Sequence, residues 1–459
     1  MAHSRRRFMQ TLAAASALPF SPAFLDALHA QASAPRRAYG PNDTIRLASI
    51  GMGIIGFANV ERALRVPGVE LVAVADCYDG RLRASQEQFG AEVATTRDYQ
   101  ELLQRDDIDA VFINTPDHWH AQQAVDALSA GKHVRCEKPM VQHIADGQRI
   151  IDAERASGKI LHVGSSGINA KGAAAAADLL QQGVIGELNM AESWVSRNSA
   201  IGAWQYSIPT DASPQTIDWK RFTGPAPDRL FDADRFFRWR KYWDYGTGIA
   251  GDMFVHRFTK FHRITASLGP VSTFSTGQIS QWNDGREVPD IQTAMYTYPE
   301  TTAHPAFTLM MNANLADGSG GAGDEFRLIG SHGVMTVNGD NVTVERTAPG
   351  LPSENGVLRG YNSVRTFDAA EQAAFADAWR QYRPEVVKAP DTDPIAFNAE
   401  DYDLGYLHIE KFFLAMRGET TIQEDATYGL RAAAPSLMAN MSYRSGQPVR
   451  WDPLGLRLL

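Results

Sequence analysis

The chain has 459 residues, of which 44% are hydrophobic and 21% are charged, a balance typical of a soluble globular protein. Its formal net charge of −9 offers no basic surface for nucleic acid, and no internal apolar run approaches the length of a membrane span, so we expect neither partner. The two cysteines, Cys77 and Cys136, cannot form a disulfide framework and have no companions at metal-ligand spacing. The length is too great for one hydrophobic core and predicts two domains.

The first 32 residues resemble a twin-arginine export signal. Ser4–Gln10 reads SRRRFMQ, a mild apolar stretch covers 11–24, and Ala30-Gln31-Ala32 is a plausible small-residue cleavage site. The order of these three features predicts that residues 1–32 are removed, that 33–43 form a polar linker, and that the mature protein is periplasmic. The alternative is a frayed basic tail.

The stretch from Ile45 to Asp76 has the pattern of a dinucleotide-binding strand, turn, helix and strand. An apolar run leads into three spaced glycines, a helical segment follows, and a second apolar run ends on an acid. In such a turn Gly51 makes the tight bend, Gly53 lets the backbone approach a pyrophosphate, and Gly56 lets the helix pack on the sheet. The pyrophosphate would lie on the free N–H groups of the helix N-terminus. The alternative, an ordinary glycine-rich turn, does not explain the two flanking strands and the acid.

Asp76 lies twenty positions after Gly56. A carboxylate at this place accepts hydrogen bonds from the adenosine ribose hydroxyls. It would repel a 2′-phosphate, so the sequence predicts NAD as the cofactor in preference to NADP.

Strand and helix patterns alternate from residue 44 to 168 and predict a doubly wound parallel sheet. Short β-branched or apolar runs mark the strands, and amphipathic or polar segments mark the helices. The expected strands are 45–50, 69–75, 92–95, 109–114, 133–136 and 160–163, and the expected helices after the glycine turn are 80–90, 99–104, 121–130 and 145–156.

From residue 169 the character of the chain changes. An alanine-rich helix, 171–182, precedes long alternating runs that predict an open, mostly antiparallel sheet. Asn338-Gly339 is a pair that tight hairpin turns favour. The runs are 188–195, 271–279, 292–298, 306–315, 325–328, 334–337 and 342–346.

The last third of the chain carries two further features. Residues 348–400 are Pro-rich and acidic and are interpreted as a long surface excursion. Residues 406–417 are expected to form a helix whose stripe of Ile409, Phe412 and Phe413 belongs to the core.

Several motifs together resemble the Gfo/Idh/MocA family, the group of glucose–fructose oxidoreductase and inositol dehydrogenase. They are NTPDHWHAQQAVDALSAGKHVRCEKPM, from Asn114 to Met140, the run Asp252-Met253-Phe254-Val255-His256, and the late EDATYGLRAA. The resemblance implies a Rossmann domain over 44–168 and an α+β domain for substrate binding and oligomerisation over 169–459. It also implies that Lys138 reaches the nicotinamide ribose and the substrate hydroxyl, with Asp252 and His256 facing it.

The chemistry of hydride transfer supports the same three catalytic residues. Oxidising a sugar carbinol needs a base for the hydroxyl proton and a cation for the developing alkoxide. His256 has the reference pKa best suited to the first task, and Lys138 supplies the charge. In a helix Asp252 and His256 lie on one face. Taken singly, each could instead be an ordinary solvated or surface residue.

The resemblance and the motifs give two sets of expected binding residues. His120 matches the family's histidine near the nicotinamide, and the aromatic, arginine-rich stretch 235–252 is a candidate sugar-binding wall. The expected cofactor contacts are Gly51, Met52, Gly53, Ile54, Ile55, Gly56, Asp76, Arg81, Asn114, Thr115, Pro116, His120, Glu137 and Lys138. The expected substrate contacts are Trp119, Lys138, Arg238, Arg240, Tyr242, Tyr245, Asp252 and His256.

Alternatives remain open for some of these positions. Trp119 could stack on a sugar or plug the domain interface, and core packing competes for Trp239 and Trp243. His262, His118 and His120 have no carboxylate or cysteine companions at ligand spacing, so no metal is expected. GSSGINA, residues 164–170, departs from the commoner family pattern, in which an aromatic residue or an arginine often stands at this place.

The sequence thus predicts an NAD(P)-dependent oxidoreductase acting on a sugar, cyclitol or glycoside hydroxyl. An exported enzyme meets no nicotinamide pool, so the cofactor is expected to stay bound and to be recycled within each cycle. The alternative within the family is a redox-neutral NAD-dependent glycoside hydrolase that oxidises, eliminates, hydrates and reduces. An alternative of another class is a non-catalytic sugar- or dinucleotide-binding protein. The open sheet and the resemblance suggest a homodimer or homotetramer.

Overall fold

The computed structural model describes residues 40, 43–319, 325–347, 353–381 and 393–459. The predicted export signal, residues 1–32, lies outside the described residues. None of the helices in the described part of the chain combines the length and the hydropathy of a membrane span.

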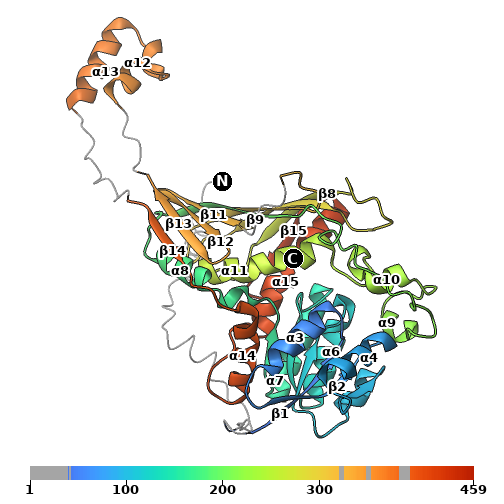
Figure 1. Cartoon of the computed structure of the whole chain (residues 1–459). Coiled ribbons are helices and arrows are strands. Elements are labelled where there is room, and N and C mark those ends of the chain that lie inside the picture. Colours follow the sequence, from blue (N-terminus) through green and yellow to red (C-terminus); the bar gives the residue numbers. More distant parts are fainter. Residues whose placement is uncertain (1–39, 41–42, 320–324, 348–352, 382–392) are drawn as a thin grey trace, which may run out of the picture. The chain divides into compact units, whose positions relative to one another are not determined.

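The first third of the described chain, the blue and cyan part of Figure 1, forms a parallel sheet. The sheet has six strands in the order β3-β2-β1-β4-β5-β6. The strand order reverses between β1 and β4, and ligands of doubly wound sheets bind at the carboxyl ends of the strands beside that point. The strands are β1 (Ile45–Ile50), β2 (Val69–Ala75), β3 (Ala94–Thr96), β4 (Ala110–Ile113), β5 (His133–Cys136) and β6 (Leu161–Val163). The predicted parallel sheet is confirmed.

Helices connect these strands in the predicted alternation. The loop expected at 115–120 is shorter than predicted, because α6 already begins at Asp117, directly after Pro116. Proline has no N–H to lose at a helix start and its fixed φ suits this position. The helices are α3 (Ile54–Leu64), α4 (Asp79–Phe89), α5 (Tyr99–Leu103), α6 (Asp117–Ser129) and α7 (Gly147–Ser157).

A ten-stranded sheet follows, in the order β14-β13-β12-β11-β7-β10-β9-β8-β15-β16. It is mostly antiparallel, as predicted, but β7 and β10 run parallel. The predicted hairpin turn at Asn338-Gly339 is confirmed, because Asn338 pairs with Asn341 and Gly339 has a φ of 60°. The strands are β7 (Leu188–Ser196), β8 (Ser272–Gln278), β9 (Ile291–Tyr298), β10 (Phe307–Asn314), β11 (Glu325–Gly330), β12 (Gly333–Asn338), β13 (Asn341–Arg346), β14 (Ile395–Asn398), β15 (Val449–Asp452) and β16 (Arg457–Leu458).

One face of this sheet is buried and the other is open. Alternate residues of β10 are buried, and they pack in one core with α8 (Lys171–Gln181) and α11 (Val255–Thr265). On the opposite face Met310 pairs with Met295, and Met295 pairs with Phe274. Met295 is 50% exposed there. The alternation of apolar and polar residues along the strands explains why one face of the sheet is packed against helices.

The interpretation of 348–400 as a surface excursion needs a correction. Its described part contains α12 (Glu354–Arg359) and α13 (Ala369–Gln381), and α13 buries no residue. Residues 395–398, however, form β14, which pairs with β13 at the edge of the sheet. Four residues, three of them apolar, gave too short a pattern to be recognised as a strand.

The end of the chain returns to the first sheet and completes its core. Ile409, Phe412 and Phe413 of α14 (Leu404–Met416) are fully buried against it, which confirms the predicted core stripe. Phe112 of β4 lies 5.9 Å from Phe412 between ring centroids. The helix α15 (Ala426–Ser445) supplies Leu430 and five neighbours to the other face. The predicted boundary at residue 168 therefore divides the sheets but not the hydrophobic cores.

Candidate functional site

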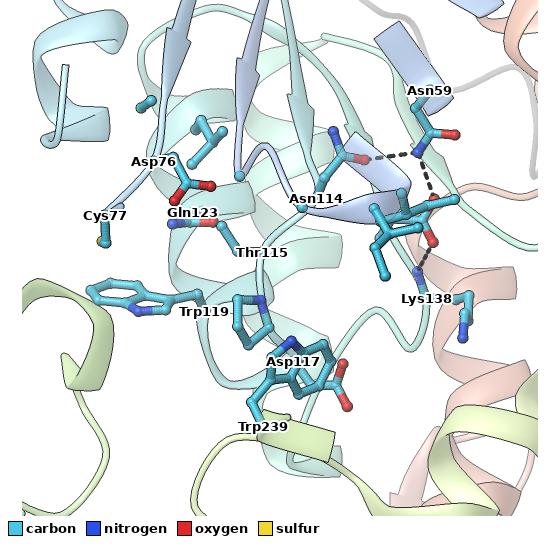
Figure 2. A pocket seen from close by; sticks show the side chains of 18 of the residues that line it. Asn59, Asp76, Cys77, Asn114, Thr115, Asp117, Trp119, Gln123, Lys138 and Trp239 are labelled. Carbon is cyan, nitrogen blue, oxygen red and sulfur yellow. Dashed lines mark hydrogen bonds between the residues drawn. The ribbon is translucent and has the colours of Figure 1, made fainter. Parts of the chain in front are cut away.

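A cavity of about 1020 Å³ lies at the carboxyl ends of the parallel strands. Its walls come from the glycine turn, from the ends of β2, β4 and β5, and from residues 197–256 of the second half of the chain. Figure 2 shows this cavity with Asp76 and Lys138 on opposite sides of Asn114. An elongated ligand is suited to a space of this kind.

The glycine turn has the geometry that a pyrophosphate requires. Gly51 has a φ of 86°, and a Cβ there would lie 2.8 Å from the Asn114 carbonyl carbon. A Cβ on Gly56 would lie 2.2 Å from the Gly51 oxygen. A Cβ on Gly53 would meet no protein atom closer than 3.9 Å. Gly51 and Gly56 are therefore needed for backbone packing, whereas Gly53 leaves space for a ligand.

The start of α3 also fits a dinucleotide. Gly53 is its N-cap and provides no side-chain cap, so the first N–H groups of the helix remain available to an anion. Ile54 and Ile55 line the cavity and are 73% and 37% exposed. Met52 is buried beneath the turn and does not line the cavity, although it was among the expected cofactor contacts.

Asp76 is held at the end of β2 by two backbone groups. The N–H of Met52 donates to its Oδ2 at 2.7 Å, and the N–H of Tyr78 donates to its Oδ1 at 2.9 Å. The Arg81 guanidinium lies 3.5 Å away. Each carboxylate oxygen keeps a second lone pair, so Asp76 can still accept from ribose hydroxyls.

A buried polar network joins the turn to the Glu137-Lys138 pair (Figure 2). The Asn59 amide donates to Asn114 at 2.8 Å and to Glu137 at 3.0 Å, and Arg135 contacts the same Glu137 oxygen at 3.1 Å. Burial would raise the pKa of Glu137, but Arg135 and Lys138 outweigh it and hold that pKa well below its usual value. The charged network fixes the backbone from which Lys138 extends.

Lys138 and Asp252 form a buried ion pair across the cavity. The Lys138 Nζ lies 2.8 Å from Asp252 Oδ1 and 3.1 Å from the Asp252 carbonyl oxygen, and the two side chains are 12% and 10% exposed. Arg240 contacts the same carboxylate at 3.3 Å. Burial would raise the pKa of Asp252, but Lys138 and Arg240 hold it well below its ordinary value.

His256 lines the same cavity, one turn beyond Asp252. A π-helical turn, Ala250–Phe254, leads into α11 and carries Asp252, so the two residues are not on one regular α-helix as expected. The His256 Nδ1 lies 3.2 Å from Ser165 Oγ. Burial, and then the charge of Lys138, lower the pKa of His256 to about 3. The imidazole is therefore neutral near pH 7 and able to accept a proton.

His120, expected near the nicotinamide, does not line the cavity. It is 1% exposed, and its ring nitrogens lie 2.7 Å from the Pro139 oxygen and 2.8 Å from the Thr115 oxygen. It links the backbone after β4 to the loop that carries Lys138. His120 therefore positions the loop that carries Lys138 and does not contact a ligand in the cavity.

The expected sugar-binding wall is divided by the structure. Arg240 lines the cavity and stacks on Trp239, 4.2 Å from the ring centroid, and Trp239 lines it as well. Arg238 instead donates to the Tyr206 oxygen at 2.7 Å, and Tyr242 and Tyr245 are buried away from the cavity. The sequence of 235–252 does not show which of its side chains face the cavity, because short helical turns and loops alternate within this stretch.

Trp119 lies at the opposite end of the cavity from Lys138, beside Cys77 (Figure 2). Its Nε1 donates to the Phe222 oxygen at 2.9 Å, and its ring packs edge-on against Tyr99. Of the two alternatives for Trp119, stacking on a sugar and plugging the domain interface, the hydrogen bond to Phe222 fits the second.

Several lining residues were not expected from the sequence. Asp117 is 2% exposed, accepts from Thr247 Oγ1 at 2.7 Å, and has a pKa raised by burial. Its place in the TPDHWH motif was a signal that could have drawn attention to it. The other unexpected lining residues include Arg135, Ser165, Arg197, Tyr206 and Met253.

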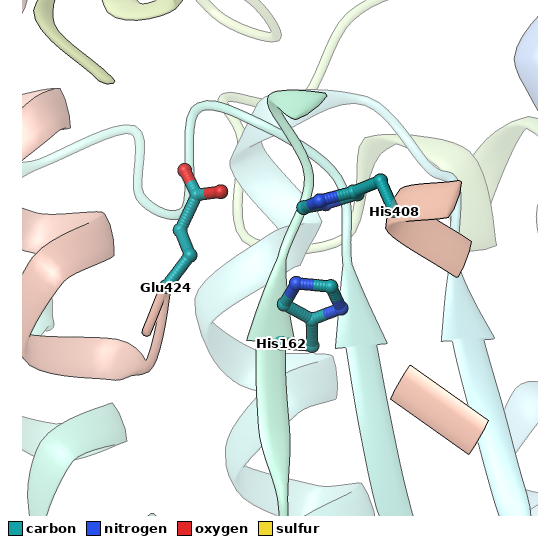
Figure 3. A group of neighbouring side chains, drawn as sticks. All are labelled: His162, His408 and Glu424. Carbon is teal, nitrogen blue, oxygen red and sulfur yellow. The ribbon is translucent and has the colours of Figure 1, made fainter. Parts of the chain in front are cut away.

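A second buried polar group lies behind the network. Ligand atoms of His162, His408 and Glu424 lie within 4.8 Å of one another (Figure 3). Both ring nitrogens of His408 already take part in hydrogen bonds, from Asn169 at 2.8 Å and to Val163 at 3.2 Å. Burial raises the pKa of Glu424 well above its usual value. Because both ring nitrogens of His408 already have partners and burial favours the neutral form of Glu424, we assign no metal here.

Comparison with known proteins agrees with this geometry. A model of the oxidoreductase family with an NAD-binding Rossmann fold matches residues 45–165, and a model of the family's C-terminal α/β domain matches residues 193–265. Residues 45–165 and 193–265 thus match the two domain models of the Gfo/Idh/MocA oxidoreductase family. The resemblance inferred from the motifs is thereby confirmed.

Two kinds of known proteins are similar to this chain in sequence. Inositol 2-dehydrogenase of Salmonella typhimurium is 36% identical over 146 residues, 31% of this chain and 44% of that protein. The chain thus aligns with less than half of that dehydrogenase. A glycosyl hydrolase family 109 protein of a Shewanella species is 26% identical over 382 residues, 78% of this chain and 72% of that protein.

Solved structures share the Gfo/Idh/MocA fold. The WlbA dehydrogenase from Bordetella pertussis, in complex with NADH and UDP-GlcNAcA, superimposes with a TM-score of 0.61 at 16% identity, covering 90% of this chain and 99% of that one. Levoglucosan dehydrogenase in complex with NADH and levoglucosan has a TM-score of 0.60 at 16% identity, covering 89% and 99%. At these identities the likeness concerns the fold.

Proposed function

We propose that this protein is an NAD-dependent oxidoreductase acting on a hydroxyl of a sugar, cyclitol or glycoside. The observation that carries the proposal is that the Lys138–Asp252 pair and His256 line the same cavity as the glycine turn. The residues present fit the cofactor, because the turn leaves space beside Gly53 and the exposed N-terminus of α3. NAD bound there would accept the hydride from the substrate carbinol carbon.

The protein's own groups supply the proton and charge chemistry. Neutral His256 accepts the hydroxyl proton, and the Lys138 ammonium stabilises the oxyanion that develops on the same oxygen. Asp252 holds Lys138 in place through their 2.8 Å contact. Arg240 and Trp239 form a stacked edge that suits a sugar ring, with donors on one side and an apolar face on the other.

Redox-neutral glycoside hydrolysis is the second candidate, and the extent of the relatives favours it. The family 109 glycosyl hydrolase matches 78% of this chain, whereas the inositol dehydrogenase matches 31%. Hydrolysis would begin with the same oxidation, which acidifies the neighbouring C–H. Elimination of the leaving group, addition of water and reduction would follow, returning the cofactor to its starting state.

We further propose that the protein is exported through the twin-arginine pathway, acts in the periplasm and assembles as a homodimer or homotetramer. The arginine-containing N-terminus supports export. The open face of the ten-stranded sheet supports assembly, because Phe274, Met295 and Met310 form an apolar row across three paired strands. Light scattering of the purified protein and fractionation of the expressing cells test these two points.

Two measurements test the proposed function. Acid-denatured purified protein should release NAD, and screening of aldoses, inositols and aryl glycosides should find a substrate oxidised or cleaved. Reaction in heavy water should place deuterium on the carbon beside the oxidised centre only if the enzyme hydrolyses glycosides. A protein that neither binds NAD nor acts on any such compound would contradict the proposal and favour a non-catalytic binding protein.

A further inference from the structure

We propose that residues 211–237, here called the clasp, form a cofactor-retaining element that closes the adenosine end of the dinucleotide site. The inference rests on the proposed function, since it concerns how the enzyme holds NAD. It assigns a binding role to a segment of the second half of the chain, outside the glycine turn and the catalytic pair.

The clasp is attached beside the acid expected to bind the ribose. Tyr78 and Ile217 form an antiparallel bridge, two residues after Asp76. The N–H of Asp218 donates to the Cys77 oxygen at 2.8 Å, and the N–H of Asp79 donates to the Thr216 oxygen at 3.0 Å. Backbone bonds of this kind hold the clasp at a fixed distance from the ribose site.

Side chains add further attachments to the segments around Asp76. Arg221 contacts Asp98 at 2.9 Å, and Arg97 donates to the Gln215 oxygen at 3.1 Å. The Tyr78 hydroxyl donates to Asp211, which also lies 3.3 Å from Arg83. The clasp thereby contacts the segments after both β2 and β3.

The clasp is a packed structure rather than a loose loop. Ile217, Phe222, Phe236 and Phe237 are buried in one cluster with Tyr78. Arg81, the neighbour of Asp76, lies over the rings of Phe236 and Phe237 at 5.4 and 5.3 Å. Opening this end of the cavity would require breaking apolar packing and ion pairs together.

The cavity wall shows what the clasp would cover. Arg221, Phe222 and Phe237 line the cavity from the clasp, together with Asp76 and with Trp119, whose Nε1 donates to the Phe222 oxygen. An aromatic and cationic roof suits the planar, electron-rich adenine ring. Extra contacts in a binding site mostly lower the dissociation rate. NAD whose adenosine is covered by the clasp should therefore dissociate slowly. Slow release matches an enzyme that recycles its cofactor within each catalytic cycle.

Exchange of bound NAD for isotopically labelled NAD tests the clasp. Asp211→Ala removes the Tyr78 and Arg83 contacts without touching the cavity. Arg221→Ala removes the contacts with Asp98 and Asp218 and also one residue of the cavity wall. We expect the wild type to retain unlabelled NAD through gel filtration and each variant to exchange at least tenfold faster. Asp211→Ala should raise the KM for added NAD more than it lowers kcat.

Asp152→Ala is the matched control, because it also removes an exposed aspartate paired with an arginine, Arg155, but on α7. Its exchange rate should equal that of the wild type. Melting curves identify any variant that fails to fold. Exchange as fast in the wild type as in both clasp variants would overturn the clasp while leaving the proposed function intact, whereas a wild type that binds no NAD would overturn the proposed function itself.

Discussion

His256 illustrates how the surroundings of one residue change its chemistry. Its reference pKa suggested a base that titrates near neutrality, but burial and Lys138 lower the pKa to about 3. The imidazole is neutral over the whole physiological range, so the proton acceptor needs no activation before substrate binds. His256 is a weak base at this pKa, but Lys138 stabilises the alkoxide that remains after proton transfer and so makes the transfer more favourable.

Replacing His256 tests this role. We expect His256→Asn to lower kcat by about 10²- to 10⁴-fold, the usual contribution of a general base, while NAD remains bound. In the wild type the acidic limb of kcat/KM should lie well below pH 6.5. His332→Asn, on the exposed hairpin between β11 and β12, is the control. A wild-type profile that falls with an apparent pKa near 6.5 would contradict the assignment.

Lys138 is tested by removing only its charge. Lys138→Gln should lower kcat by two orders of magnitude or more, because the oxyanion loses its cation. It should also destabilise the fold by about 3 kcal/mol, because Asp252 would keep a buried charge with Arg240 as its remaining partner. Steady-state kinetics and urea unfolding measure the two effects, and unchanged turnover would exclude a catalytic role.

At the scale of elements, the turn between β1 and α3 separates two uses of glycine. Gly51 is needed by the fold, because its φ is 86° and Asn114 lies against it. Gly53 is needed by the ligand, because no protein atom occupies the space beside it within 3.9 Å. The motif alone suggested that its glycines serve both backbone packing and ligand binding. The geometry assigns packing to Gly51 and ligand space to Gly53, so substitutions at the two positions should have different effects.

A pair of alanine substitutions tests this distinction. Gly53→Ala should melt within a few degrees of the wild type but bind NAD at least tenfold more weakly, because the new methyl group enters the pyrophosphate space. Gly51→Ala should lose both stability and binding. Differential scanning calorimetry and NAD titration provide the data, and equal NAD affinity in Gly53→Ala and wild type would place the pyrophosphate elsewhere.

At the scale of the whole molecule, the two halves of the sequence share their cores. α14 and α15 follow the ten-stranded sheet in the chain, yet Phe412 and Leu430 pack against the six-stranded sheet. A fragment of residues 43–168 would expose this apolar surface. We expect it to lack a cooperative thermal transition, measured by circular dichroism, whereas a fragment melting like the full chain would show that α14 and α15 are dispensable.

Buried histidines should make the stability of the whole molecule depend on pH. Burial lowers the pKa of His118 to about 4 and the pKa values of His262 and His408 to about 3. Between these values and about 6.5 the unfolded chain binds more protons than the folded chain, so stability falls as pH falls. Glu424, whose pKa is raised, acts in the opposite direction above its ordinary value.

The buried histidines with lowered pKa values, which also include His162 and His256, outnumber the two carboxyl groups with raised pKa values, Glu424 and Asp117, and each group contributes at most about 1.4 kcal/mol per pH unit. The melting temperature should therefore decrease from pH 6.5 to pH 4.5. A melting temperature that stays constant or rises over this interval would show that these histidines are protonated in the folded protein.

The sequence by itself determined the local structure of this protein. The strands 45–50 and 69–75, the turn between them and the core stripe of α14 follow from patterns of a few adjacent residues, and the family motifs named Lys138, Asp252 and His256. Only the tertiary structure decided that Arg240 and Trp239 face the cavity while Tyr242 and Tyr245 do not, that His120 supports a loop, and that Trp119 lies at the Asp76 end. The physical reason is that a side chain's direction and pKa depend on elements far away in the chain, such as the clasp over Asp76, and no local pattern records which of those elements lies beside it.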